Sequence, residues 1–407
     1  MAAPVRDHLL ARGKQADRAN SFLHRAWGKG WLRPPVLEPD ALWAVAAKPF
    51  GDGAKAAEQS GRAPHEVCDF RQRRERLVEA VRSEANLNPL GQAMAYGQLV
   101  RVISNRLKFG QYWAQKDFPR DVELMPAPIL IIGHMRSGTT RVHHLFAADP
   151  AHSHTRYCDA WRPVPSALPG NLALRRLNGS LALTMLAALN PWFQSIHPAQ
   201  SGGVEEELAW LAGALNHSIY ESQWRIPSFS AWSEARDPSP IYSEFARILT
   251  ADAVHRDVIL KPRVMKAPQF SEDLATLLEQ FPDAKIILTQ RETEAVLKSA
   301  VSLAANQFAI QTDNADLGEI EALWRHKIAL RESRVASALS NWDGAVTRLN
   351  FDELNADWEG AIERAYQELD LTLTDAARSI MRKTMAKSAK GSHTQHSQQL
   401  GRFADQS

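Results

Sequence analysis

The spacing of apolar residues changes along the 407-residue chain. In the first part, apolar residues recur at steps of three and four. The clearest run is Tyr96, Leu99, Val100, Ile103 and Leu107. These steps place all five side chains on one face of a helix. Residues 1–122 are therefore predicted to form a mostly helical accessory region.

Short unbroken runs of aliphatic residues appear after residue 123 and indicate buried strands. They lie within Pro128–Ile132, Val258–Lys266, Lys285–Gln290 and Ala345–Phe351, with helical segments between them. Strands that alternate with helices are typical of a parallel sheet covered on both faces. Residues 123–407 are therefore predicted to be a three-layer α/β domain with a parallel central sheet, entered through the linker Asp121–Pro128.

Residues from about 150 to 250 carry many Trp, Pro and Leu residues but few strand signals, which predicts a helical insertion in the α/β domain. The apolar stretch Leu181–Leu189 is far shorter than the roughly 20 residues that cross a bilayer. It is predicted to be a buried or substrate-facing helix, and no transmembrane segment is expected. Residues 1–8 lack the long apolar core of a signal peptide, which favours a cytoplasmic protein.

Composition narrows the class of protein only a little. The net charge is +2 with both signs spread along the chain, whereas a nucleic-acid surface would show a concentrated basic patch. The two cysteines, Cys68 and Cys158, form neither a disulfide framework nor a metal motif. His152 and His154 are two residues apart but have no evident third ligand, so no metal site is predicted.

The first predicted strand ends in a loop that is suited to binding an anion. Gly133 to Gly138 is followed directly by Thr139 and Thr140, and a helix is expected from Arg141. Small residues let backbone N–H groups converge on an anion, and the helix dipole favours negative charge. The loop is therefore predicted to bind phosphate or sulfate.

The loop differs from the ordinary Walker A sequence G-x-x-x-x-G-K-[ST] at one decisive position. Gly133 and Gly138 keep the glycine spacing, but Thr139 stands where the lysine should be, and Arg136 now supplies the cation. An NTPase is therefore disfavoured. A P-loop small-molecule kinase remains an alternative, although it would need a lysine at position 139 and an aspartate for Mg²⁺.

The segment Pro128–Thr140 resembles the 5′-phosphosulfate loop of sulfotransferases that use 3′-phosphoadenosine 5′-phosphosulfate (PAPS). Its R-S-G-T-T form is most similar to bacterial sulfotransferases and tyrosylprotein sulfotransferases. Over roughly residues 90–400, the resemblance implies a P-loop-like fold and transfer of a sulfuryl group from PAPS, without a metal, to a hydroxyl or amine of a small-molecule acceptor. The cofactor contacts that it implies in this loop are Arg136, Ser137, Gly138, Thr139 and Thr140.

A second block extends the resemblance. Arg263–Pro268 is followed by Phe281–Arg291 and then by Ser299, eight residues after the arginine. In the family the matching arginine and serine hold the 3′-phosphate of PAPS, so the resemblance implies that role for Arg291 and Ser299. It also implies that Lys390 and Gly391, in the polar tail, belong to a basic loop over the same phosphate.

The resemblance also suggests residues for the chemistry. Charge builds up on the sulfuryl oxygens and on the departing phosphate, so two cations are expected near one another. Arg136 and Lys266 match the family positions, with Lys266 as the catalytic lysine. The family places a carboxylate general base about twenty residues after the loop, and here Asp159 matches it, one methylene shorter than the usual Glu.

Acceptor contacts are expected from the insertion. His197 is followed by an acidic run that contains Glu206, a pattern frequent in bacterial relatives, and both residues are predicted to contact the acceptor. Helical periodicity would turn only one or two of the three glutamates inward. Phe270 stands where many relatives have a histidine, which keeps open a PAP- or PAPS-binding protein without turnover. The acceptor and the oligomeric state are not determined by the sequence.

Overall fold

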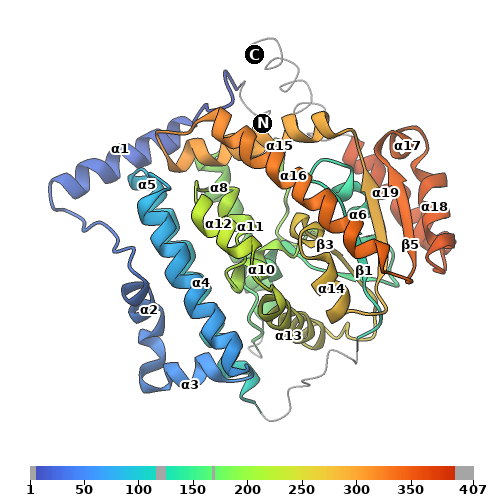
Figure 1. The fold of residues 1–407 in the computed structure, drawn as a ribbon, viewed down its shortest axis with the longest axis horizontal. Helices are drawn as coiled ribbons and strands as arrows, with labels where there is room; N and C mark the ends of the chain where they lie inside the picture. The colour runs from blue at the N-terminus through green and yellow to red at the C-terminus, as the bar shows by residue number, and fades with distance from the viewer. Residues whose placement is uncertain (1–5, 116–124, 167–169, 390–407) are drawn as a thin grey trace.

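The computed structural model describes residues 6–115, 125–166 and 170–389. Within these residues a five-stranded sheet is surrounded by helices (Figure 1). Its strands are β1 (Ile129–Ile132), β2 (Ser153–His154), β3 (Arg263–Lys266), β4 (Lys285–Gln290) and β5 (Val346–Asn350). All neighbouring strands are parallel, and their spatial order is β2-β3-β1-β4-β5. The predicted parallel α/β sheet is confirmed, although β3 is shorter than the predicted strand Val258–Lys266.

Alternate residues of the strands point into two separate cores, so the sheet is the middle layer of three. Leu130, Met265 and Ile286 pack on one side with α13 (Ser239–His255) and α14 (Leu274–Gln280). The residues that alternate with them pack on the other side against three helices. These helices are α6 (Thr139–Ala147), α18 (Trp358–Glu368) and α19 (Asp375–Ala389). Apolar residues on both faces make a strand a buried, continuous aliphatic run, which is the signal seen in the sequence.

The first third of the described chain is helical, as predicted. Its elements are α1 (Lys14–Gly28), α2 (Pro39–Ala47), the 3-10 helix η1 (Lys48–Gly53), α3 (Ala54–Gln59), α4 (Pro64–Ser83) and α5 (Pro89–Trp113). The predicted helical run from Tyr96 to Leu107 lies within α5. Half of the predicted linker, residues 121–124, and the boundary at residue 122 lie outside the described residues.

Within the described residues, the segment between β2 and β3 contains helices and no strand of the sheet, and it corresponds to the predicted insertion. It contains α7 (Tyr157–Trp161), α8 (Asn171–Leu189), α9 (Phe193–Ile196), α10 (Leu208–Gly213), α11 (Ser218–Glu221) and α12 (Pro227–Glu234), and ends with α13. Its Leu215, Tyr220 and Trp224 share one apolar core with Phe70 and Leu99 of the N-terminal helices. The insertion and the N-terminal helices therefore pack as one body beside the sheet, and their division into separate domains stays a prediction.

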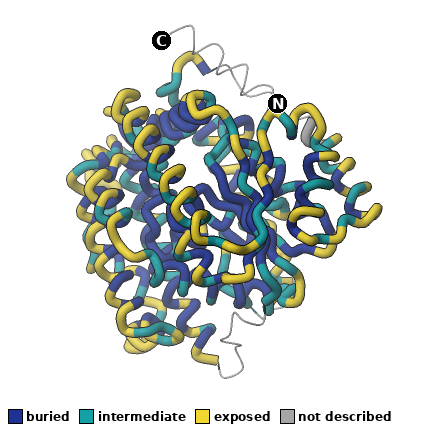
Figure 2. Tube along the Cα trace, turned by 45° about the vertical axis from the view of Figure 1, so that its right-hand side comes forward, coloured by how far each residue is buried: buried dark blue, intermediate teal, exposed yellow. Residues whose placement is uncertain are grey.

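The remaining helices connect the strands and close the molecule. They are η3 (Pro268–Ser271), α15 (Thr293–Gln311), α16 (Leu317–Ser340) and α17 (Phe351–Ala356). The dark blue buried trace in Figure 2 runs through the centre of the molecule, and exposed yellow segments surround it. No helix in the described ranges is both long enough and apolar enough to cross a bilayer.

Candidate active site

The ends of three neighbouring strands meet at one edge of the sheet. Ile131 of β1 is paired with Lys266 of β3, and Ile132 is paired with Leu288 of β4. The loop after β1 therefore begins between the last residue of β3 and the end of β4. Parallel α/β sheets bind ligands at the carboxyl ends of their strands, where the chain leaves in opposite directions.

The backbone of the first loop takes a shape that needs glycine. Gly133 and Gly138 have φ values of 150° and 94°, and Arg136 has a φ of 70°. A Cβ atom at Gly133 would lie 2.2 Å from Oγ1 of Thr289. Gly138 caps α6 without any side-chain hydrogen bond, so the N–H groups of the first turn of α6 have no side-chain cap. Such a helix end favours a bound anion, and α6 begins at Thr139, two residues before the predicted start at Arg141.

Two hydroxyl groups hold the loop in place. Ser137 is fully buried, and its Oγ donates to the carbonyl of His134 at 2.7 Å and lies 2.7 Å from Oγ1 of Thr289. Thr289 belongs to β4, so this contact ties the loop to the adjacent strand. Ser137 was predicted to contact the cofactor, but its hydroxyl is engaged within the protein, and we expect its contribution to be loop geometry.

The residues predicted to hold the 3′-phosphate gather beside this loop. Nε of Arg136 donates to Oγ of Ser299 at 3.0 Å, and the Arg291 guanidinium donates to the carbonyl of Arg136 at 2.7 Å. Arg291 also lies over the ring of Phe351 at 4.0 Å. Burial, followed by the charge of Arg291, lowers the pKa of Arg136. Two neighbouring arginines without a carboxylate between them favour a bound anion. Lys390 and Gly391 lie outside the described residues.

A cavity opens between this loop and the insertion. Its walls include residues predicted to contact the nucleotide and residues predicted to contact the acceptor. From the sheet side come Arg136, Thr139, Thr140 and Lys266, and from the insertion come His197, Glu205 and Glu206. The structure therefore brings the two predicted cations and both predicted acceptor residues into one pocket.

Lys266 is held from three directions. Its Nζ lies 3.4 Å from Oγ1 of Thr140 and forms an ion pair with Glu206. Its backbone N–H donates to Oε2 of Glu207 at 2.7 Å. Glu207 also accepts a hydrogen bond from the Thr155 hydroxyl at 2.7 Å, and burial raises the pKa of Glu207 to about 7. The Lys266 ammonium is thus fixed beside the first turn of α6.

His197 and Glu205 form a second pair in the pocket. Nε2 of His197 lies 3.2 Å from Oε1 of Glu205. Burial acts to lower the pKa of His197, but the Glu205 carboxylate outweighs it, and the pKa is raised. The same pairing overcomes burial and lowers the pKa of Glu205. Among the residues that the structure describes, Nδ1 of His197 has no hydrogen-bond partner. An imidazole oriented by a carboxylate through one nitrogen can accept a proton at the other.

Sequence reasoning missed Glu205 and Glu207, because it treated the acidic run as helical. Residues 204–207 precede α10 and are not helical, so the three consecutive glutamates diverge to three partners. Glu205 meets His197, Glu206 meets Lys266, and Glu207 meets Thr155. Their position after His197 was the only signal in the sequence. His143 was also missed, and it lines the same pocket from α6.

Asp159 lies elsewhere. Its side chain is fully buried and is not among the residues that line the pocket. Its carboxylate lies 2.5 Å from Arg156 and 2.9 Å from Arg175, and Arg256 is 3.8 Å away. Burial acts to raise the pKa of Asp159, but the hydrogen bond and charge of Arg156, with the other arginines, lower it. The structure does not bring the predicted general base to the site, because three cations hold it as an internal anion.

Phe270, which stands where many relatives have a histidine, is fully buried in the core under the sheet and lies 5.9 Å from the ring of Phe245. In this chain position 270 therefore faces the core. The departure from the family pattern removes no group from the pocket described above.

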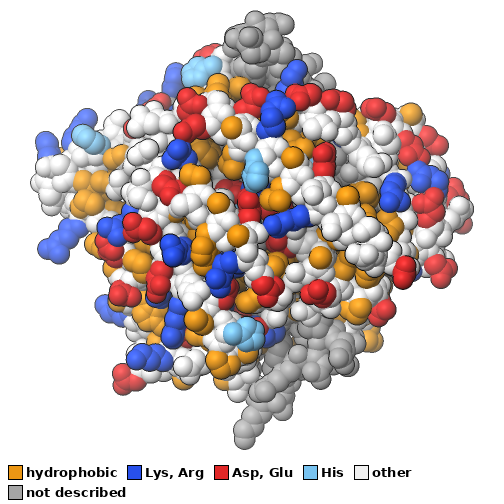
Figure 3. All heavy atoms as spheres, in the orientation of Figure 1, with side chains coloured by type: hydrophobic (Ala, Val, Ile, Leu, Met, Phe, Trp, Pro, Cys, Tyr) orange, Lys and Arg blue, Asp and Glu red, His pale blue; other side chains and the backbone are white. Residues whose placement is uncertain are grey.

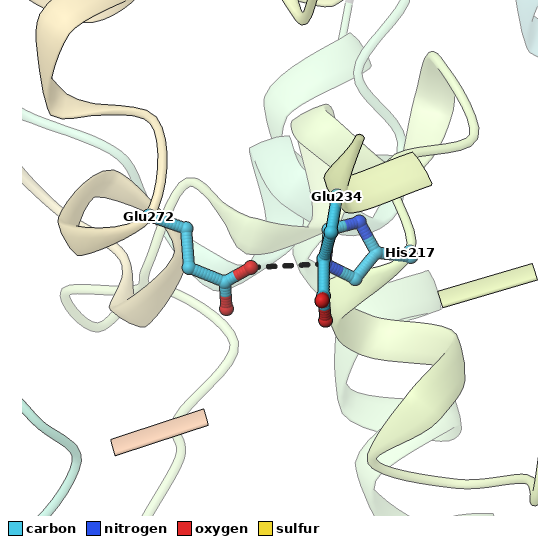
Figure 4. A group of neighbouring side chains, drawn as sticks. All are labelled: His217, Glu234 and Glu272. Carbon is cyan, nitrogen blue, oxygen red and sulfur yellow. Dashed lines mark hydrogen bonds and ion pairs between the residues drawn. The ribbon is translucent and has the colours of Figure 1, made fainter. Parts of the chain in front are cut away.

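One group of side chains outside the pocket has the composition of a metal site. His217, Glu234 and Glu272 point toward one another from the insertion and from the segment after β3 (Figure 4). The ammonium of Lys327 lies among them, 2.6 Å from Glu234, 3.0 Å from Glu272 and 2.9 Å from Nε2 of His217. It also pairs with Glu221 at 2.9 Å. These residues have a cation of the protein's own at their centre, and we assign the cluster a structural role.

Comparison with known proteins agrees with this geometry. Residues 128–375 match the model of the sulfotransferase family, which is more than half of the chain. The chain belongs to the sulfotransferase family. This membership confirms the resemblance seen in the sequence, and it does not favour the kinase alternative.

Individual relatives extend the comparison over most of the chain. The chain is 24% identical over 257 residues to omega-hydroxy-beta-dihydromenaquinone-9 sulfotransferase Stf3 of Mycobacterium tuberculosis, and the match covers 60% of this chain and 63% of the relative. The same holds for Stf3 of Mycobacterium bovis. The crystal structure of sulfotransferase STF1 from Mycobacterium tuberculosis superimposes with a TM-score of 0.73 at 26% identity, over 90% of this chain and 99% of that one. Sulfotransferase STF9 from Mycobacterium avium shares the fold, with a TM-score of 0.75 at 19% identity, over 88% of this chain and 89% of that one.

Proposed function

We propose that this chain transfers the sulfuryl group of PAPS to the hydroxyl of an acceptor that enters between the phosphate loop and the insertion. The observation that carries the proposal is the convergence of Lys266, Arg136 and His197 on one cavity at the ends of parallel strands. Family membership supports the donor, because sulfotransferases generally use PAPS.

Each residue has a role that follows from its place. The uncapped first turn of α6 and the guanidinium of Arg136 line a place that suits an anion, and we assign the 5′-phosphosulfate to it. Arg291 and Ser299, beside Arg136, fit the 3′-phosphate. Lys266 lies next to Thr140 of the same turn, where an ammonium stabilises the negative charge of the departing phosphate.

In this proposal the pair of His197 and Glu205 takes the role of general base that the resemblance implies for Asp159. In the reaction the acceptor oxygen forms a bond to sulfur, and the bond from sulfur to the 5′-phosphate oxygen breaks. The hydroxyl proton passes to Nδ1 of His197, while Glu205 stabilises the imidazolium that results. The products are adenosine 3′,5′-bisphosphate (PAP) and the sulfated acceptor.

The relative Stf3 is named for a lipid alcohol, the ω-hydroxyl of a menaquinone derivative. We propose an alcohol acceptor for this chain as well. A small-molecule acceptor fits a cavity whose insertion wall also includes Ile196, Pro198 and Val204.

Calorimetry with three nucleotides tests the donor. We expect PAP to bind far more tightly than adenosine 5′-monophosphate, because Arg291 and Ser299 contact only the 3′-phosphate. Equal affinity for the two would remove that assignment, and a preference for ATP with Mg²⁺ would favour the kinase. Mass spectrometry of a cell extract incubated with the protein and isotopically labelled PAPS then tests transfer. Tight binding of PAP without any labelled product would indicate a nucleotide-binding protein without turnover.

A further inference from the structure

The exposed large apolar side chains of this protein are concentrated in two segments. Of the thirteen that occur among the described residues, four lie between residues 22 and 36 and five lie between residues 172 and 185. The first group is Phe22, Trp31, Leu32 and Val36, and the second is Leu172, Leu174, Leu177, Leu181 and Met185. We call these two segments together the apolar surface. Clusters of exposed apolar residues mark interaction sites, whereas scattered ones need no explanation.

The second group lies on α8, which was predicted to be buried or substrate-facing. Steps of three and four place Leu174, Leu177, Leu181 and Met185 on one stripe of the helix. The Leu181 side chain is 55% exposed and that of Met185 is 68% exposed, so the stripe is not buried in this chain. The buried alternative is therefore wrong for this face, because α8 packs through its opposite side, which carries Arg175 and Leu183, whereas the substrate-facing alternative stays a prediction.

The helix α1, which carries Phe22 of the first group, is in contact with α8. Leu23 of α1 and Leu189 of α8 pack against the same small apolar cluster, and the helices are in contact. Gly13, just before α1, approaches Pro191, just after α8. The two helices therefore adjoin where α1 begins and α8 ends.

The charges around the apolar surface are strongly biased. Residues 14–36 contain five basic residues and one acidic residue, and α8 contains no Asp or Glu. The single acid, Asp17, is already paired with Arg12 at 2.6 Å. Lys and Arg side chains gather over α1 at the left edge of the molecule in Figure 3. The exposed basic residues between positions 14 and 36 are Lys14, Arg18, Arg25, Lys29 and Arg33.

We propose that the apolar surface docks on an anionic lipid bilayer. Basic side chains beside exposed Trp, Phe and Leu side chains match a negatively charged interface that has an apolar layer beneath it. Trp31 is 62% exposed, with the Lys29 ammonium 4.8 Å from its ring, and aromatic side chains of this kind settle at the headgroup level.

The position of α8 links docking to the candidate active site. The chain leaves α8 at Leu189, forms α9, and arrives directly at Ile196, His197 and Pro198, which line the pocket. A bilayer held against α8 would present an alcohol group of a lipid to the insertion wall of that pocket. This extension to the acceptor rests on the proposed sulfuryl transfer, whereas the docking itself does not.

Vesicle flotation with the full chain tests the docking. We expect the protein to float with vesicles of equal parts phosphatidylglycerol and phosphatidylcholine, and much less with phosphatidylcholine alone. The double variant Leu177→Glu/Leu181→Glu should bind anionic vesicles roughly tenfold more weakly or worse, and added salt should weaken the wild type. Leu260→Glu is the matched control, because Leu260 is 81% exposed but lies outside the apolar surface.

Three results would overturn the docking. They are no flotation of the wild type with either vesicle, equal flotation of the double variant and the wild type, and an equal loss in Leu260→Glu. Light scattering tests whether a second copy of this chain covers the apolar surface instead. A wild-type dimer that becomes a monomer in the double variant, without vesicle binding, would assign the surface to a second copy of this chain.

Two further readouts separate the docking from the proposed function. PAP binding in solution should be the same in the wild type and the double variant, and its absence from both would refute the nucleotide assignment while leaving the flotation result intact. With labelled PAPS, a polyprenol in anionic vesicles should be sulfated faster by the wild type than by the double variant. Equal rates, or no label on the polyprenol, would overturn the extension to a membrane acceptor.

Discussion

The two walls of the candidate active site are built in different ways. The nucleotide wall is carried by strand ends, and backbone pairing alone sets Ile131 beside Lys266. In the described residues no strand of the sheet runs through the insertion wall, although Val204 forms a single bridge with Arg156 and the Glu207 N–H donates to the Lys266 carbonyl at 3.3 Å. The insertion wall is held by buried ion pairs such as those between Asp159 and the arginines at positions 156, 175 and 256. Backbone pairing sets the position of the nucleotide wall, and strands of this kind leave a pattern in the local sequence. Side-chain pairs between residues far apart in the chain leave no such pattern.

The largest effect is expected from breaking the anchor of the insertion wall. Asp159→Asn leaves Arg156 and Arg175 without their carboxylate in a buried place, which should cost about 3–5 kcal/mol of stability. Urea unfolding measures this loss, with Asp283→Asn, on an exposed turn, as the control. The folded fraction should still turn over. A stable Asp159→Asn protein with turnover lowered about a hundredfold would instead restore Asp159 as the general base.

A substitution in the nucleotide wall should lower turnover more than it lowers stability. Lys266→Ala removes the ammonium beside Thr140 and should lower turnover by about a hundredfold or more, with a smaller change in affinity for PAP. Steady-state kinetics and calorimetry together separate the two effects. Lys261→Ala is a suitable control, since this exposed lysine contacts the carbonyl of Pro150. Turnover like that of the wild type would exclude Lys266 from the chemistry.

A third substitution, at Arg291, tests nucleotide binding by the nucleotide wall separately from catalysis. Arg291→Ala should weaken PAP binding by about 1.5–3 kcal/mol, as expected for a charge-assisted hydrogen bond. Affinity for adenosine 5′-monophosphate should stay the same, because that nucleotide has no 3′-phosphate. Arg348→Ala, an exposed arginine on β5, provides the control. An equal loss for both nucleotides would place Arg291 in loop structure only, through its bond to the carbonyl of Arg136.

The smallest effect concerns the pH profile of the insertion wall. His197 accepts a proton only when neutral, so turnover should rise as the pH increases through its pKa, which Glu205 raises above the ordinary value. Glu205→Gln removes the charge that stabilises the protonated imidazole, and the rise should move to lower pH. Profiles of turnover against pH measure this shift, and Glu279→Gln, on the surface of α14, should leave it in place. An unmoved profile in Glu205→Gln would show that another group titrates.

The sequence was sufficient for the sheet because both faces of its strands are buried. Ile129–Ile132 and Lys285–Gln290 stand out as aliphatic runs for that reason. The prediction failed at Val258–Ile259, which lie in a turn after Asp257, a residue with a φ of 54°. The two-residue strand β2 left no signal at all, because Ser153 and His154 are polar and are placed by pairing with β3 and by contacts with residues about 100 positions further along the chain.

The site residues were likewise predictable where they lie at strand ends, and not where they depend on contacts between distant residues. Lys266 ends a strand, and Arg136, Arg291 and Ser299 follow strands at fixed spacing. The structure brings Arg136 into contact with Arg291 and Ser299 and into one pocket with Lys266. Asp159 has the right spacing, but its burial depends on Arg175 and Arg256, which lie 16 and 97 residues further along the chain. No local pattern reports such a contact.

The buried ammonium of Lys327 has a consequence for how the molecule opens. It joins α16 to Glu221 and Glu234 of the insertion and to Glu272, six residues after Lys266. Separating any one of these segments would leave a charge in the interior without its counter-ion. We therefore expect these segments to come apart in one cooperative step, with amide hydrogens that exchange with solvent through that shared opening. The lysine would then make α16, the insertion and the segment after β3 a single unit of unfolding.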